Sequence, residues 1–135
     1  MAVKATPVFA QTTRTAQAVC TAAKVIDATQ TGTQLLLQAG VDGTIVTKLQ
    51  AMPRATVTAT QLQLYLSRDG GTSLSLVGSA AMGAYTLTQT TAAPTTDFGF
   101  SAEDPLRLGP DERLYVAIGV ALAGGIVFHA EYADF

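Results

Sequence analysis

The protein has 135 residues, a mass of 13.9 kDa and a net charge of −2 from eight basic and ten acidic side chains. This balance excludes the basic field that nucleic-acid binding needs, and the single cysteine, Cys20, excludes an internal disulfide. Charged residues make up only 13% of the chain, whereas 20 threonines and 23 alanines are present. The length predicts one domain with its own core, and the composition predicts a largely uncharged surface.

The sequence gives no indication of targeting or membrane insertion. The N-terminal residues contain Lys4 but no apolar segment of the kind found in signal peptides. The longest apolar run, residues 114–127, is interrupted by Gly119, Gly124 and Gly125 and is too short for a membrane span. We therefore expect a chain made in a cytoplasm, with no membrane partner.

The first part of the chain predicts an arm followed by strands. Residues 1–17 contain Pro7 and few large apolar groups, so we expect an extended N-terminal arm, with residues 18–135 forming a single domain. Threonine is β-branched and favours strands, and no helical period is present. A strand is predicted over residues 19–29, and the apolar run at 35–37 predicts a strand covered on both faces.

Turn residues and alternation define the next strand. Residues 40–43, Gly-Val-Asp-Gly, predict a tight turn. Apolar side chains alternate from Ile45 to Ala51, and Pro53 is expected to end that strand because it cannot donate a ladder hydrogen bond. The apolar phase changes near Thr60, which predicts a bulge or a break there.

Residues 61–77 predict a β-hairpin. Leucines at alternate positions from Leu62 to Leu66 share one face, and residues 68–71, Arg-Asp-Gly-Gly, form the turn. We expect Leu74 and Leu76 to continue the leucine face on the return strand.

The following region predicts a long connection and a short edge strand. Residues 85–96 are rich in Thr and Ala, with one short strand expected at 85–88. Phe98 and Phe100 share a face and are expected to fill the core. Leu106 and Leu108 lie between two prolines and predict a short edge strand, which a turn at residues 109–112 follows.

The C-terminal region alternates over residues 114–122 and again over 126–132, on either side of Gly124-Gly125, which predicts two strands joined by a turn. The small residues from Ala117 to Ala121 predict the close approach of another backbone. About eight strands without crossover helices predict an all-β fold, an antiparallel, jelly-roll-like β-sandwich.

The titratable residues do not predict a reaction centre. His129 and Glu131 share a strand face, but two ligands do not make a metal site. Cys20 lacks a nearby base and is expected to be a buried hydrophobe. Six further acids follow turn chemistry without the spacing of a calcium loop; they are Asp42, Asp69, Asp97, Asp104, Asp111 and Glu112. We expect no enzyme, metal or cofactor, although two of these carboxylates meeting as a glycosidase pair stays open.

Five segments, in this order, carry a resemblance to a known family. They are Thr6-Pro7-Val8-Phe9, Leu-x-Ala-Gly-x-x-Gly-Thr-x-Val at 37–46, Leu-x-Leu-Tyr-Leu-Ser-x-Asp-Gly-Gly at 62–71, Leu-x-Val-Ala-Ile-Gly at 114–119 and Glu-Tyr-Ala-Asp-Phe at 131–135. In this arrangement the chain resembles the small β-sandwich virion proteins of tailed bacteriophages, of the capsid decoration (cement) type.

The resemblance implies a structural virion protein that binds the outer capsid surface and stabilises the head. Its partners would be the major capsid protein and further copies of itself, with a trimer favoured. Thr6, Pro7, Val8 and Phe9 would be the partner-binding residues of the arm. A tail, collar or spike-base component of the same fold is one alternative. A carbohydrate- or receptor-binding module is another, although the absence of tryptophan counts against it.

Overall fold

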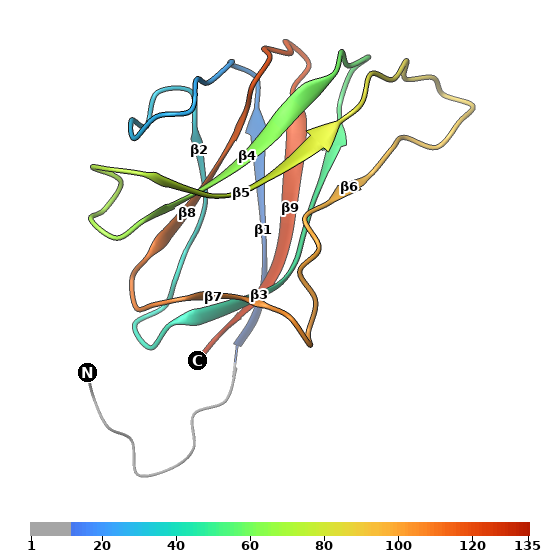
Figure 1. Ribbon diagram of the computed structural model, residues 1–135. Helices are drawn as coiled ribbons and strands as arrows, with labels where there is room; N and C mark the ends of the chain where they lie inside the picture. Colours follow the sequence, from blue (N-terminus) through green and yellow to red (C-terminus); the bar gives the residue numbers. More distant parts are fainter. Residues whose placement is uncertain (1–11) are drawn as a thin grey trace.

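The computed structural model describes residues 12–135, which form two antiparallel sheets packed face to face, with no helix among them (Figure 1). Sheet A has the order β1-β9-β3-β6, with β7 also paired to β3, and sheet B has the order β2-β8-β4-β5. The strands are β1 (Thr12–Cys20), β2 (Gln34–Gln38), β3 (Thr44–Pro53), β4 (Thr60–Ser67), β5 (Ser75–Met82), β6 (Thr96–Asp97), β7 (Leu106–Leu108), β8 (Arg113–Ile118) and β9 (Ile126–Asp134).

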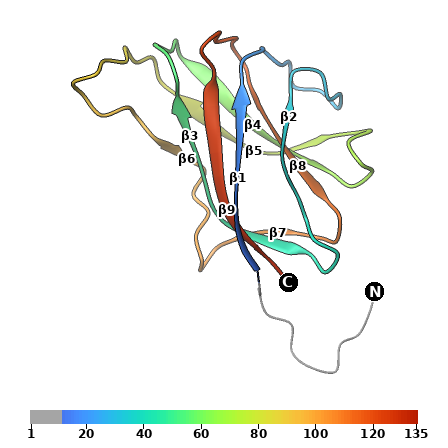
Figure 2. The same ribbon diagram turned by 180° about the vertical axis from the view of Figure 1, so that it is seen from behind.

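The topology is that of a jelly roll. Strands β7 and β6 pair with the beginning and the end of β3 along the same edge, at residues 44–46 and 50–51. The nine described strands therefore occupy eight positions, four in each sheet, and all but one of the connections between these positions cross from one sheet to the other. The predicted antiparallel, jelly-roll-like β-sandwich is confirmed, and Figure 2 shows it from the side of sheet A.

The core lies between the sheets. The largest fully buried apolar side chains in it are Phe128, Leu49, Leu62, Leu64, Leu114, Ile118, Ile126, Val46 and Val116. Phe98 and Phe100 pack against this cluster as predicted, and the Phe98 and Phe128 ring centroids lie 6.3 Å apart. Strands β3, β4 and β9 supply most of these side chains because every second residue points inward. In β3 a bulge at Thr47 interrupts this alternation, so Val46 and not the predicted Ile45 enters the core.

The N-terminal predictions need correction. Residues 12–17, expected in the arm, belong to β1, which pairs with β9 along its whole length. The strand predicted over 19–29 is wrong, because β1 ends at Cys20 and residues 21–33 form a loop. Ala16 and Ala18 face the core from β1, and side chains this small give weak alternation in the sequence. Residues 1–11, which include the predicted Thr6-Pro7-Val8-Phe9 segment, lie outside the described residues.

The return strand of the predicted hairpin also changes face. Strand β5 pairs with β4, but Leu64 lies opposite Gly78 while Tyr65 lies opposite Leu76. Val77 is therefore a bulge, and one extra residue moves every residue before it to the other face. Leu74 packs beside Tyr65 on the outside of sheet B instead of joining the leucine face.

Two further predictions differ in detail. The strand predicted over 114–122 forms as β8 but already ends at Ile118, and the strand predicted over 126–132 forms as β9. The two strands lie in different sheets and make no hairpin. The short strand expected at 85–88 is reduced to a single bridge from Tyr85 to Val57.

Several local predictions are confirmed. Strand β3 ends at Pro53 and β4 begins at Thr60, which places the break where the apolar phase changes. Turns form at 40–43 and 109–112, and β7 is a short edge strand. The predicted close backbone approach is present too, since the amide of Lys24 donates to Ile118 O at 2.9 Å.

Candidate functional site

Strand β1 begins at one end of the sandwich, and we call this the Val41 end. It comprises the first residue of β1, the turns at 40–43 and 109–112, and the C-terminal residue Phe135. Thr12 lies opposite Asp134 in the sheet, so residues 1–11 join the fold beside the C-terminus. The beginning of β1 and the C-terminus lie close together in Figure 1.

Val41 is an exposed apolar side chain on a firmly held turn. Its side chain is at the tip of turn 40–43, and the residue is 77% exposed. The amide of Gly43 donates to Gly40 O at 3.1 Å, and the amide of Asp111 donates to the same oxygen at 3.2 Å. The amide of Phe135 donates to Gly43 O at 3.2 Å. The turn is thus fixed to both of its neighbours, and Val41 is presented in one position.

A carboxylate connects three strands at this end. Asp134 on β9 accepts a hydrogen bond from Arg14 Nε on β1 at 2.8 Å and another from the hydroxyl of Thr44 on β3. The Thr44 hydroxyl in turn accepts from the amide of Gly40 at 3.1 Å. Thr44 is fully buried, so this polar network stiffens the Val41 end from inside.

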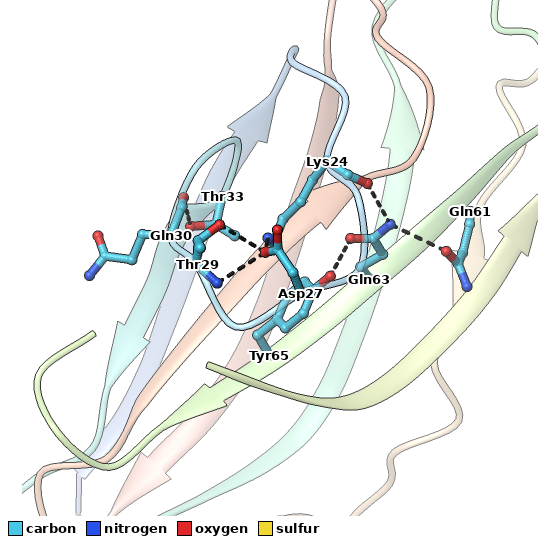
Figure 3. A network of polar contacts seen from close by, with 8 residues as sticks. All are labelled: Lys24, Asp27, Thr29, Gln30, Thr33, Gln61, Gln63 and Tyr65. Carbon is cyan, nitrogen blue, oxygen red and sulfur yellow. Dashed lines mark hydrogen bonds and ion pairs between the residues drawn. The ribbon is translucent and has the colours of Figure 1, made fainter. Parts of the chain in front are cut away.

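At the opposite end, the loop of residues 21–33 crosses the outer face of sheet B around a buried lysine (Figure 3). The Lys24 side chain is only 1% exposed, and its Nζ lies 2.7 Å from Asp27 Oδ1. The same Nζ lies 5.1 Å from the centroid of the Tyr65 ring. The cation is therefore stabilised by one carboxylate and by the face of one aromatic ring.

Side chains of sheet B complete this Lys24 cluster, which we define as Lys24, Asp27, Gln63 and Tyr65. Gln63 Nε2 donates to Lys24 O at 3.1 Å, and the Tyr65 hydroxyl donates to Gln63 Oε1 at 2.6 Å. The cluster fixes the loop against the sheet and leaves Val25 75% exposed at the loop tip. We call this the Val25 end of the molecule; it includes the nearby residues 119–125.

Two pKa values in the Lys24 cluster are shifted. The Lys24 ammonium, followed by the amide and hydroxyl of Thr29, lowers the pKa of Asp27 to about 2. Burial raises the pKa of Tyr65. Both shifts favour the protonation states that the hydrogen bonds require, so the cluster is a structural clamp at neutral pH.

A shallow hollow of about 350 Å³ lies along the β4–β5 hairpin. Its lining consists of Leu66, Arg68, Asp69, Ser73, Ser75 and Val77. Asp69 already accepts from the Ser67 hydroxyl at 2.9 Å and from the amide and hydroxyl of Ser73 at 3.0 and 2.7 Å. These bonds lower its pKa to about 2, the Ser73 amide most of all. The lining offers one carboxylate and no aromatic ring, whereas a glycosidase needs two acids.

The other titratable residues are dispersed. His129 Nε2 lies 3.9 Å from Glu131 Oε2, and Lys48 Nζ lies 3.7 Å from the same oxygen, all on the outer face of sheet A. Within residues 12–135, no group of three or more His, Cys, Asp or Glu side chains is placed to hold a metal ion. Cys20 is buried as expected, and desolvation raises its pKa to about 12.

The sequence did not predict the Lys24 cluster. Lys24 and Tyr65 are 41 positions apart, and the fold brings them together only because residues 21–33 cross sheet B. The one sequence signal for the cluster is the position of Lys24, a single charged residue between Ala22-Ala23 and Val25-Ile26.

In the part of the chain that the structure describes, no helix is long and apolar enough to cross a membrane. Comparisons with protein-family models, with curated proteins and with solved structures found no match for this chain.

Proposed function

We propose that this protein is a structural component of a tailed-phage virion that binds the outer surface of the capsid and stabilises the head. Two things support the proposal. One is the resemblance carried by the five segments from Thr6 to Phe135. The other, which carries it structurally, is the Val41 end, where an exposed valine on a rigid turn lies beside the attachment point of residues 1–11.

In this proposal the Val41 end faces the capsid. Residues 1–11 and Val41 would contact the major capsid protein together, because Thr12, to which residues 1–11 are attached, lies at the same end of the sandwich as Val41. A surface rich in Thr and Ala has little charge to desolvate when it is covered. Contacts of roughly 800 Å² per partner are enough for a specific complex.

The protein is further proposed to act as a homo-oligomer, with the trimer that the resemblance favours. Several copies that bind neighbouring capsid sites at once raise the overall affinity without any new contact. We propose that the protein catalyses no reaction and uses no cofactor. The polar groups of its hollow support this, since Asp69 is already engaged within its own turn.

The test is sedimentation of the protein with undecorated capsids assembled from the major capsid protein of the same phage. We expect the protein to sediment with these shells, and Val41→Glu to weaken binding at least tenfold. Val25→Glu is the matched control, because Val25 is equally exposed at the opposite end. A wild-type protein that stays in the supernatant contradicts the proposal.

The same experiment separates the alternatives. Binding to purified tails instead of shells would favour a tail, collar or spike-base component. Clear binding on a glycan array, with none to shells, would favour a carbohydrate- or receptor-binding module.

A further inference from the structure

We propose that two copies of this protein associate through strand β5, pairing antiparallel so that their sheets B join into one continuous eight-stranded sheet. The partner is a second copy of the chain, and the contact does not depend on the capsid. This proposal therefore stands or falls separately from the proposed function.

The first observation is that β5 is an open edge. Among residues 12–135, β5 pairs with β4 alone and lies at the end of sheet B. An edge strand presents a row of unpaired backbone N–H and C=O groups, and natural proteins protect such rows with charges, prolines or very short strands. Strand β5 has eight residues, Ser-Leu-Val-Gly-Ser-Ala-Ala-Met, with no charge and no proline.

The other edges of the sandwich are protected. Strand β1 carries Arg14 and β7 carries Arg107, while β6 has only two residues. Strand β2 has only five residues. Of the edges that the structure describes, β5 is thus the long one without a charge, and its one irregularity is the bulge at Val77.

The second observation is the absence of charge in β5 and in the residues that flank it in the sequence. Residues 70–96 contain no Asp, Glu, Lys, Arg or His, a run of 27 residues in a chain with 18 charged side chains. In a two-fold contact the same surface meets itself, so a charge near the axis lies close to its own copy. An uncharged strand avoids this repulsion. A two-fold axis perpendicular to the sheet also places the two copies of β5 antiparallel to each other.

The third observation is exposed apolar surface at the beginning of the strand. Leu76 is 39% exposed and Val77 is 46% exposed. Adjacent strand residues normally point to opposite faces of the sheet, yet neither of these two side chains is buried. The bulge at Val77 leaves Gly78–Met82 in regular register with β4. Pairing of two such segments, centred near Ser79 or Ala80, would add backbone hydrogen bonds and bring Leu76 and Val77 against the end of the partner strand.

The mass of the full-length protein tests the pairing. We expect sedimentation velocity to show an even number of copies, a dimer or, if a trimer forms through another surface, a hexamer. Ser79→Lys should weaken the two-fold association at least tenfold because two ammonium groups would meet near the axis. Thr15→Lys, on the edge strand β1, is the matched control and should leave the mass unchanged.

A cross-link tests the same contact without weakening it. Cys20 is fully buried, so an introduced cysteine can be labelled alone. We expect Ser79→Cys to be joined into covalent dimers by a short bismaleimide, and Thr15→Cys not to be. A wild-type protein that is monomeric at about 100 µM, or one whose mass corresponds to an odd number of copies, overturns the proposal. Dimers that do not bind capsids would contradict the proposed function but would leave the β5 pairing supported.

Discussion

Lys24 is a buried cation whose partners are few and specific. A buried ammonium is costly unless it is paired, and here Asp27 and the Tyr65 ring supply the pairing. The two charged partners are unequal in exposure, because the Asp27 side chain is 42% exposed whereas that of Lys24 is almost fully covered. Removal of the Asp27 carboxylate and removal of the Lys24 ammonium should therefore change the stability of the fold by different amounts.

We predict that Asp27→Ala lowers the Tm more than Lys24→Met does. The first change leaves a buried ammonium without its carboxylate, whereas the second leaves a carboxylate that water can reach and fills the lysine site with an apolar chain. Thermal unfolding followed by circular dichroism measures both. An equal or larger loss in Lys24→Met would show that the ion pair is not what stabilises the loop.

Substitutions at two glycines with positive φ, Gly70 and Gly43, measure the cost of backbone strain with and without added steric crowding. Gly70 has φ +72° and open space around it, so Gly70→Ala should cost about 1 kcal/mol. Gly43 has φ +93°, and a methyl group there would lie 2.9 Å from Leu108 O. Gly43→Ala should cost roughly 2–4 kcal/mol because overpacking is added to the strain. Urea unfolding checks the pair, and similar losses would contradict the assigned crowding.

At the scale of elements, two loops depend on ionised carboxylates. Asp27 holds loop 21–33, and Asp69 holds the turn between β4 and β5, and each has a pKa of about 2 in the fold instead of the usual 3.8. A pKa lowered by folding contributes stability that is complete above the unfolded value and disappears as the pH falls through the folded value.

We therefore predict that the free energy of unfolding from these two groups is constant above about pH 4 and falls between pH 4 and pH 2. Urea unfolding at pH 5, 3 and 2 measures the slope. The double variant Asp27→Asn/Asp69→Asn should be less stable at pH 5 and lose less on acidification. A double variant with the wild-type slope would mean that other carboxylates cause the acid sensitivity.

The same elements show how far the sequence allows prediction. The strand at 126–132, with large alternating side chains, was predicted with the correct inward face. In β3 the prediction is correct for Leu49 and Ala51 but wrong for Ile45, because a bulge at Thr47 turns Val46 inward instead. The first half of β1 was missed because Thr and Ala differ little in hydrophobicity. Leu74 was placed on the wrong face because a single bulge at Val77 reverses the alternation, and its only sequence signal is the neighbouring Gly78.

The assignment of strands to the two sheets could not be predicted from the sequence, because it depends on where the connecting loops cross the sandwich. The glycines at 124–125 indicated a hairpin, yet β8 and β9 lie in different sheets because residues 119–125 are long enough to cross the sandwich. The Lys24 cluster likewise depends on a crossing loop that tertiary packing creates. The predicted partner-binding residues Thr6, Pro7, Val8 and Phe9 lie outside residues 12–135, so they remain a prediction.

At the scale of the whole molecule, the part of the chain that the structure describes has two different ends and, in β5, a long edge strand without charge. The Val41 end combines an exposed valine, a buried polar network and the attachment of residues 1–11. The Val25 end is held by the Lys24 cluster. We propose that the first end binds the capsid and that the β5 edge binds a second copy, so that one rigid body serves two contacts.

Electron cryo-microscopy of capsids incubated with the purified protein tests the central proposal most directly. The proposed function predicts one β-sandwich density at each of a regular set of positions on the outer surface, with the turn of Val41 and the beginning of β1 directed at the shell. Bare shells at saturating protein, or sandwiches attached through the Val25 end, would contradict it.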